Sequence, residues 1–326
     1  MRDVTEIFTT LGERLREFGS SAESRAVVAS AIEGNTWFTE QSIVRAVEAI
    51  RTDMLDKRKL EEWLCRYPAT HRPKRVAIIM AGNIPLVGFF DLLCVLCSGH
   101  KAYIKPSSKD RVLVQYIVDT LRSIEPDIAI YDYSASDHYD MVIATGSDEA
   151  NRYFESQFAD CKRLLRGSRH SVAALEGNES DDELRGLYED ITAYFGLGCR
   201  SVSMLFVPEG HNLAIPQTEE RLHPKYSRCV ASTRALLKMQ SREFGDFGAF
   251  ITIEGKEFAT NLATVVVQHY RDIEQVKRWL AEHREQIQCV VSHLDIEGCV
   301  PFGKAQHPEL WDYADGVDTM AFLTSE

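Results

Sequence analysis

Cys199 is the residue whose surroundings best suit a chemical role. It ends the segment Phe195-Gly-Leu-Gly-Cys, whose two glycines allow a tight turn and close approach of a ligand. A thiol becomes nucleophilic when it is accessible and when backbone amides or a cation lower its pKa, and Arg200 supplies a cation directly after it. The alternative is a buried structural thiol. Cys94 and Cys97 illustrate that role, since they lie in an apolar segment without the spacing of a metal site.

Two further polar residues could take part in catalysis. Asn83 lies in Ala81-Gly-Asn-Ile-Pro, directly after an apolar segment, where its side-chain amide could donate to a developing oxyanion. The alternative is a loop asparagine that caps the next helix. Glu176, in Leu175-Glu-Gly, could act as a general base, and the alternative is an acid in a surface turn.

Two other segments suit a nucleotide. Tyr103-Ile-Lys-Pro-Ser-Ser places the cation of Lys105 and the hydroxyls of Ser107 and Ser108 at the end of an apolar segment, where a ribose would lie. In Thr145-Gly-Ser, a turn at Gly146 and Ser147 could offer backbone N–H groups to a pyrophosphate. Either motif alone is common, so it is the order of the motifs along the chain that is informative.

These segments fall at the junctions of a predicted parallel sheet. Short apolar segments predict strands at 76–81, 102–105, 128–131 and 141–145, and helical spacing predicts intervening helices such as 109–123. Continuous apolar strands that alternate with helices are typical of a parallel sheet covered on both faces, with its ligand at the carboxyl ends of the strands. The predicted fold class is therefore α/β, with a doubly wound cofactor domain.

Helices precede this sheet and a second α/β unit follows it. Apolar residues at helical spacing predict helices over the first 70 residues, one of them capped by Thr39. Further along, a helix leads to Cys199 and a strand covers 203–207. We expect N-terminal helices and an NAD(P)-binding domain at 1–172, a catalytic domain at 173–295, and a return segment at 296–326 that packs on the cofactor domain or a partner subunit.

Composition excludes several classes of function. The chain has 326 residues, of which 44% are hydrophobic and 26% charged, as in an ordinary globular protein. A net charge of −12 disfavours broad binding to nucleic acid or to anionic membranes. No apolar run is long enough to span a bilayer, and the start of the chain resembles neither a secretory signal nor an anchor. Eight scattered cysteines then predict reduced thiols and a cytoplasmic protein.

The order of the motifs resembles the aldehyde-dehydrogenase superfamily, and the closer resemblance is to its LuxC-type acyl-CoA reductases. An Asn-x-Pro loop is followed by Lys-Pro-Ser, Thr-Gly-Ser, Leu-Glu-Gly and Phe-Gly-x-x-Cys. The resemblance extends from about residue 75 to the end of the sequence. The segments that carry it are 82–91, 98–110, 171–177, 195–201 and 303–323.

The resemblance implies an aldehyde-dehydrogenase-like fold and a definite chemistry. Cys199 would attack an acyl thioester such as a fatty acyl-CoA, and a nicotinamide hydride would then reduce the enzyme-bound thioester to an aldehyde. Asn83 and the backbone N–H of Cys199 would form the oxyanion hole. Lys105 would bind the adenosine ribose, Gly146 and Ser147 would lie near the pyrophosphate or nicotinamide, and Ser107, Ser108 and Pro85 complete the expected cofactor contacts.

Ser108 indicates which nicotinamide cofactor is used. In many NAD-preferring aldehyde dehydrogenases a glutamate stands three residues after the lysine and accepts from the ribose 2′-OH. Here that position is Ser108, and Lys109 follows it. Since a hydroxyl and a cation tolerate a 2′-phosphate that a carboxylate would repel, the sequence predicts NADPH as the cofactor.

Glu176 also departs from the superfamily pattern. The residues after it are Gly-Asn-Glu and not the usual Leu-Gly-Gly, and a thioester reductase needs no base for hydrolysis. Glu176 remains a catalytic candidate with this reservation. Arg166, Arg169 and His170 could contact cofactor phosphates or CoA, although we favour an ordinary surface role for Arg169.

The closing segment and the possible partners complete the expectations. Trp311, Tyr313 and Phe322 indicate a docking tail that packs on the sheet or on a second subunit. The superfamily implies a homo-oligomer, and an acyl-activating enzyme is a possible partner. Two other functions stay open: oxidation of an aldehyde to an acid, which would need Glu176, and a non-catalytic scaffold of an acyl-transfer complex.

Overall fold

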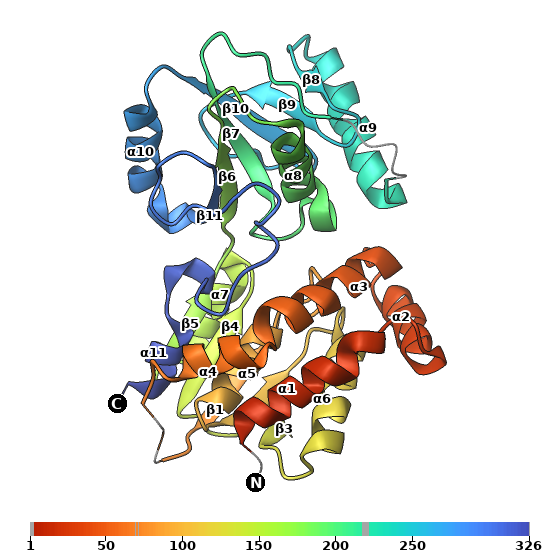
Figure 1. Cartoon of the computed structure of the whole chain (residues 1–326), viewed down its shortest axis with the longest axis vertical. Coiled ribbons are helices and arrows are strands. Elements are labelled where there is room, and N and C mark those ends of the chain that lie inside the picture. The colour runs from red at the N-terminus through yellow and green to blue at the C-terminus, as the bar shows by residue number, and fades with distance from the viewer. Residues whose placement is uncertain (1–2, 69, 71, 217–221, 326) are drawn as a thin grey trace. The chain divides into compact units, whose positions relative to one another are not determined.

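The computed structural model describes residues 3–68, 70, 72–216 and 222–325 (Figure 1). Contacts within the chain divide it into two units. The first unit comprises residues 1–168 and 308–326, and the second comprises residues 169–307. Each unit has its own sheet and its own hydrophobic core.

The first unit begins with the predicted helices. In the described part of this region they are α1 (Val4–Arg14), α2 (Ala22–Gly34), α3 (Glu40–Ala49) and α4 (Lys57–Leu64), with a π-helical turn at Ile50–Met54. The predicted cap at Thr39 is confirmed. Its hydroxyl accepts from the N–H of Ser42 at 3.1 Å, and the Ser42 hydroxyl accepts from the N–H of Thr39 at 2.9 Å. This reciprocal box satisfies backbone donors that the start of a helix leaves unpaired.

The predicted parallel sheet follows these helices. Its described strands are β1 (Arg75–Ile79), β2 (Lys101–Lys105), β3 (Ile130–Asp132), β4 (Met141–Thr145) and β5 (Lys162–Arg166), in the order β3-β2-β1-β4-β5. Every pair is parallel. The connecting helices are α5 (Phe89–Cys97), α6 (Arg111–Ile124) and α7 (Asp148–Gln157).

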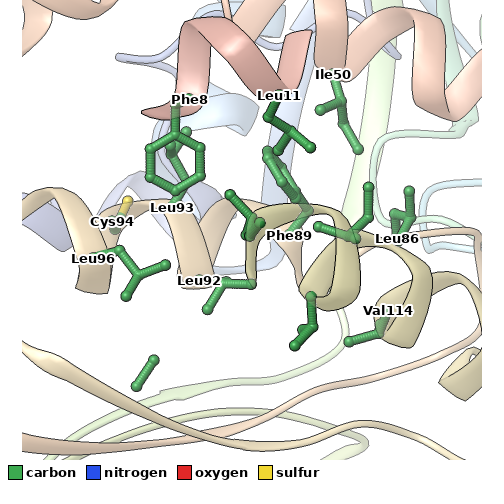
Figure 2. Packing of buried hydrophobic residues seen from close by; sticks show 14 of the residues in the cluster. Phe8, Leu11, Ile50, Leu86, Phe89, Leu92, Leu93, Cys94, Leu96 and Val114 are labelled. Carbon is green, nitrogen blue, oxygen red and sulfur yellow. The ribbon is translucent and has the colours of Figure 1, made fainter. Parts of the chain in front are cut away.

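One face of this sheet carries the main core. Val76 and Ile78 of β1 belong to a buried cluster that also takes in residues of α1, α5 and α6. Figure 2 shows Phe8 of α1 pointing toward α5, where its ring centroid lies 6.4 Å from that of Phe89. Burial of each such side chain contributes about 1.5–3 kcal/mol, so packing fixes these helices on the sheet.

The other face also carries a helix, as predicted: Ala77 of β1 and Val142 of β4 cluster with Phe154 of α7. Residues 133–140, all of them described, connect β3 to β4 through turns and contain no helix. Tyrosines add to this cover: Tyr103 stacks on Tyr131 with ring centroids 5.0 Å apart, and Tyr133 stacks on Tyr139 at 5.2 Å.

The end of the chain packs on the first unit. It forms a short helix, α11 (Thr319–Thr324), and places Leu310, Met320 and Leu323 in the main core. The indole N–H of Trp63 donates to the Tyr313 hydroxyl at 2.7 Å, and Lys162 Nζ donates to the Phe322 carbonyl at 2.8 Å. Trp311 keeps 40% of its surface exposed.

The second unit is built on a second sheet. Its described strands are β6 (His170–Ala174), β7 (Val202–Pro208), β8 (Gly245–Asp246), β9 (Ile251–Glu254), β10 (Thr264–Tyr270) and β11 (Ile287–Val291), in the order β11-β6-β7-β10-β9-β8. Only the described pair β8–β9 is antiparallel. The helices are α8 (Asp181–Thr192), α9 (Pro224–Met239) and α10 (Ile273–Glu282).

The bounds of the units differ from the domain bounds expected at 172 and 295. The second unit starts at residue 169 because β6, which begins at His170, pairs with β7 and β11. It extends to residue 307 because Val300 bridges to Val291 and because Asp190 of α8 accepts from the N–H groups of Gly303 and Ala305. Among the described residues, no helix combines the length and apolar character needed to cross a membrane.

Candidate active site

Three of the predicted segments meet at one edge of the first sheet. The loop with Asn83 follows β1, the segment with Ser107 and Ser108 follows β2, and the turn at Gly146 follows β4. Because β2, β1 and β4 are parallel neighbours, all three lie at the carboxyl edge of the sheet, where open α/β folds bind their ligands.

The Asn83 loop packs tightly against the segment that follows β2. A Cβ added to Gly82 would lie 2.6 Å from the Cβ of Ser107, so only glycine allows this approach. Asn83 itself is exposed. Pro85, by contrast, is buried, so its ring packs within the loop, and its predicted contact with the cofactor stays a prediction.

The end of β2 and the residues after it carry the cation and the hydroxyls that were predicted to face a ribose. Lys105 and Ser108 are exposed, and the ammonium of Lys105 lies 5.4 Å from the ring centroid of Tyr133. The Ser107 hydroxyl accepts from the N–H of Lys109 at 3.3 Å. This segment therefore presents cations and hydroxyls at the expected ribose position.

The turn after β4 is built as the sequence predicts. Ser147 caps α7, since its side chain accepts from the N–H of Ala150 at 3.3 Å. A Cβ on Gly146 would lie 2.9 Å from the Cβ of Ala150, which explains the glycine. Asp148 and Glu149 stand in the first turn of α7, where they offset the positive end of the helix dipole. The turn therefore suits a phosphate through its backbone N–H groups more than through charge.

In the second unit, an unusual backbone turn leads to Cys199. Tyr194, Phe195 and Gly196 follow one another with φ values of 51°, 59° and 70°. A non-glycine residue in this left-handed region costs about 1–2 kcal/mol, and such strain clusters at functional sites. The Cys199 residue is exposed, and its carbonyl accepts from the Ser171 hydroxyl at 2.9 Å. The nucleophile candidate is thus both accessible and anchored through its backbone.

Arg200 is held beside Cys199 by a loop near the end of the second unit. Its guanidinium donates to the carbonyl of Ala305 at 3.3 Å. Asp190, which is buried, fixes this loop by accepting from the N–H groups of Gly303 at 2.7 Å and Ala305 at 3.0 Å. Burial raises the pKa of Asp190 to about 7. Asp190 is not among the site residues predicted from the sequence.

Glu176 does not lie with Cys199. The parallel strands β6 and β7 pair Ser171 with Val202 and Ala174 with Phe206. Cys199 comes before β7, next to Ser171, whereas Glu176 comes after β6, beyond Ala174. The four residue-to-residue steps from Val202 to Phe206 alone span roughly 13 Å at a strand rise of about 3.3 Å per residue. A general base must reach its proton directly or through one water, so the predicted base role of Glu176 toward Cys199 is wrong.

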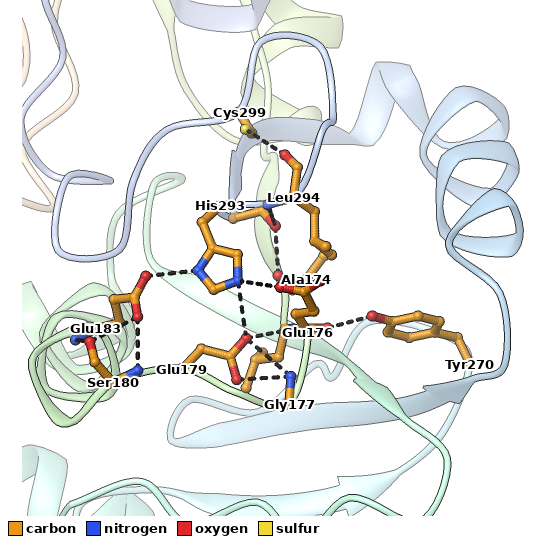
Figure 3. Close-up of polar contacts among 12 residues, drawn as sticks. Ala174, Glu176, Gly177, Glu179, Ser180, Glu183, Tyr270, His293, Leu294 and Cys299 are labelled. Atoms are coloured by element: carbon orange, nitrogen blue, oxygen red, sulfur yellow. Dashed lines mark hydrogen bonds and ion pairs between the residues drawn. The ribbon is translucent and has the colours of Figure 1, made fainter.

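Glu176 belongs instead to an ionic cluster around His293 (Figure 3). The imidazole lies between Glu183, whose Oε1 is 2.7 Å from Nδ1, and Glu176, whose Oε2 is 3.2 Å from Nε2. The hydrogen bond to Glu183 is the main cause that raises the pKa of His293, and the same bond lowers the pKa of Glu183 to about 2. The cluster joins the ends of β6 and β11 to the start of α8.

The three polar residues near the point in the sequence where the first unit gives way to the second, Arg166, Arg169 and His170, have structural partners. Arg166 is buried and pairs with Asp91 at 2.5 Å, so it is not a surface contact for phosphates. Arg169 donates to the carbonyls of Arg284 and Ile287, which agrees with the ordinary structural role favoured from the sequence. His170 stacks on Phe258 with ring centroids 4.0 Å apart, and burial lowers its pKa.

Solved structures with the same arrangement define the class of fold. The aldehyde dehydrogenase of Bacillus cereus, solved as an NAD⁺ complex, matches with a TM-score of 0.63 over 91% of this chain and 73% of its own, at 16% identity. Aldehyde dehydrogenase 21 of Physcomitrella patens, solved with the product succinate, matches with a TM-score of 0.60 over 90% and 73%, at 12% identity. The chain therefore has an aldehyde-dehydrogenase-like fold.

A sequence comparison then identifies the family. The acyl-CoA reductase (LuxC) family matches residues 35–232, more than half of the chain, and the protein belongs to that family. The long-chain acyl-protein thioester reductase of Aliivibrio fischeri is 25% identical over 217 residues. This match covers 60% of the chain and 44% of the relative, so it takes in less than half of that relative's length.

The position of Glu176 gives a first prediction. Glu176→Gln is expected to change the turnover of an acyl thioester less than about threefold, because the carboxylate lies at the opposite end of the strands from Cys199. Steady-state kinetics with acyl-CoA and NADPH would measure this. A matched change at the other contact of the same imidazole, Glu183→Gln, controls for disturbance of the cluster. A loss of a hundredfold or more in Glu176→Gln alone would restore the base role.

Proposed function

We propose that this protein uses NADPH to reduce an acyl thioester to an aldehyde through an acyl-enzyme intermediate on Cys199. The single observation that best supports this proposal is the exposed Cys199 behind three left-handed residues. Membership of the acyl-CoA reductase family indicates the thioester substrate. The A. fischeri relative is named for acyl groups bound to protein, so both acyl-CoA and acyl-protein thioesters are candidate substrates.

The chain's own residues account for the first half of the reaction. The thiolate of Cys199 attacks the thioester carbonyl carbon, and the new negative charge on oxygen is stabilised by the side-chain amide of Asn83 and the backbone N–H of Cys199. The carbon–sulfur bond to the carrier then breaks, and the released thiolate takes a proton from water. The acyl group remains on Sγ of Cys199.

The cofactor supplies one hydride to this acyl carbon. Lys105, Ser107, Ser108 and the turn at Gly146 and Ser147 are the residues proposed to hold it. Breakage of the bond to Sγ then releases the aldehyde and regenerates the thiolate. The sum is acyl thioester, NADPH and one proton giving aldehyde, free thiol and NADP⁺. No step requires a base that activates water, which agrees with the distance of Glu176 from Cys199.

The decisive assay is a panel of acyl thioesters with NADPH. Purified protein should consume NADPH, measured by absorbance, and release one free thiol for each NADPH consumed. Acyl-CoA substrates of graded chain length and an acyl-protein thioester would define the carrier and the acyl group. Oxidation of aldehydes without thiol release would indicate the dehydrogenase alternative. Absence of both reactions, together with no thermal shift on nucleotide addition, would indicate a non-catalytic scaffold. An oligomer and an acyl-activating partner enzyme remain part of the proposal.

Cofactor preference gives a second prediction. Ser108→Glu should reduce the affinity for NADPH by roughly tenfold or more relative to NADH, because a carboxylate at this exposed position repels the 2′-phosphate and accepts from a 2′-OH. Ser108→Ala is the matched control and should keep the NADPH preference, since Lys109 is unchanged. Fluorescence titration of both nucleotides would measure the dissociation constants. Tighter binding of NADH than of NADPH by the unaltered protein would contradict the assignment.

A further inference from the structure

Asp110 is a buried carboxyl that serves a loop other than its own. It stands at the start of α6, where an aspartate side chain usually caps the helix, yet it makes no capping hydrogen bond. Its Oδ2 accepts from the backbone N–H of Leu86 at 2.8 Å. Only 2% of the Asp110 surface is exposed, and Oδ1 has no hydrogen-bond partner among the described residues. A buried polar group with this geometry is costly and calls for a specific role.

Leu86 needs such an anchor because its backbone is strained. Its φ is 55°, a left-handed value that costs a leucine about 1–2 kcal/mol. The side chain of Leu86 lies in the main core, as Figure 2 shows. The bond from Asp110 therefore holds the end of the loop in a conformation that leucine alone would not favour.

The start of the same loop is held from another side. Asn35, at the end of α2 and 6% exposed, donates from Nδ2 to the carbonyl of Gly82 at 3.2 Å. Gly82 also packs on Ser107, and a Cβ there would lie 3.2 Å from that of Asp110. Asn83, between the two anchored ends, stays exposed.

We propose that Asp110 and Asn35 are positioning residues that hold the Asn83 loop from its two ends. Asp110 lies two residues after Ser108, so its bond to Leu86 also couples the proposed cofactor segment to the proposed oxyanion loop. This inference rests on the proposed role of Asn83. Neither residue touches the reacting atoms in this proposal, because each acts through the backbone of the loop.

The chemistry of the anchor predicts which substitution is tolerated. Burial raises the pKa of Asp110 to about 8, so the carboxyl is largely neutral at pH 7. A neutral acid accepts from Leu86 through a carbonyl oxygen, and the amide of Asp110→Asn offers the same acceptor. Asp110→Ala removes it and leaves the N–H of Leu86 unpaired.

Amide hydrogen exchange tests the positioning without relying on catalysis. In Asp110→Ala, peptides covering residues 82–88 should exchange about tenfold faster than in the unaltered protein, consistent with the loss of one hydrogen bond. Asn35→Ala should loosen the same peptides. Asp110→Asn should stay within about threefold of the unaltered protein. Asp119→Ala, an exposed carboxylate on the same helix, is the matched control and should change nothing.

A burst assay links the loop to the chemistry. With acyl-CoA and no NADPH, release of one equivalent of thiol reports acylation of Cys199, and its rate should fall about tenfold or more in Asp110→Ala and Asn35→Ala. Absence of a burst in the unaltered protein would count against the proposed function. The exchange measurement would then decide by itself whether Asp110 and Asn35 position the loop. Unchanged exchange in Asn35→Ala and Asp110→Ala, or equal loosening in Asp110→Asn and Asp110→Ala, would overturn the inference. If Asp110→Ala does not fold, Asn35→Ala and Asp110→Asn still decide it.

Discussion

Cys199→Ala is expected to lower thioester-dependent consumption of NADPH by at least about 10⁴-fold. Removal of a nucleophile that forms a covalent intermediate leaves only binding and oxyanion stabilisation, which cannot replace the acyl transfer. Release of free thiol should disappear together with NADPH consumption, because both depend on the same acyl-enzyme. The substitution removes an exposed side chain, so stability should change by less than about 1 kcal/mol.

Two measurements make this test specific to the nucleophile. Intact-mass analysis after incubation with acyl-CoA should show one acyl group on the unaltered protein and none on Cys199→Ala. Cys65→Ala, which removes another exposed thiol, is the matched control and should be acylated and reduced normally. Turnover by Cys199→Ala within tenfold of the unaltered protein would exclude the acyl-enzyme pathway. An acyl group on a different cysteine would move the nucleophile to that residue.

The elements with regular apolar patterns could be predicted well from the sequence. β4 begins and ends where the apolar run Met141–Thr145 does, and α6 lies within two residues of the predicted 109–123. β5, Lys162–Arg166, could not be recognised in this way, because three of its five residues are basic. Its last residue, Arg166, is buried and pairs with Asp91, a contact between residues 75 positions apart.

The position of a site residue could be predicted where it depends on the end of one strand. The prediction failed where it depends on the alignment of two strands. Asn83, Ser108 and Gly146 each follow a strand within four residues, so their common edge follows from the parallel order. Glu176 and Cys199 also flank strands, but one follows β6 and the other precedes β7. Motif order along the chain does not distinguish these two ends, and only the strand register does.

The anchors of the site illustrate the same limit. Asp110 belongs to a segment that the family resemblance includes, yet its bond to Leu86 joins residues 24 positions apart, and Asn35 reaches Gly82 across 47 positions. Nothing in the local pattern of either residue indicates its partner. Such contacts depend on how α2 and α6 pack on the sheet, which the spacing of apolar residues does not specify.

The second large effect concerns stability: Asp91→Ala should destabilise the first unit by about 3–5 kcal/mol. Asp91 Oδ1 lies 2.5 Å from Arg166 Nη1, and both side chains are 6% exposed. Arg166 also donates from Nη2 to the Thr319 hydroxyl of α11 at 2.7 Å. Removal of the carboxylate leaves a buried guanidinium without its counter-charge, and that uncompensated charge is the main cause of the loss.

Thermal unfolding would measure this effect as a fall of roughly 10 °C in the transition of the first unit, given about 2–4 °C per kcal/mol for a unit of this size. Glu62→Ala is the matched control, because Glu62 pairs with Arg66 on the surface and contributes less than about 1 kcal/mol.

The double change Asp91→Leu with Arg166→Met should recover most of the stability, since an apolar pair carries no buried charge. Because Arg166 also donates to Thr319, Asp91→Ala should speed amide exchange in α11. The double variant lacks this hydrogen bond, so it should slow the exchange in α11 again only in part. A fall of less than 3 °C in Asp91→Ala would mean that water reaches the guanidinium and replaces the carboxylate.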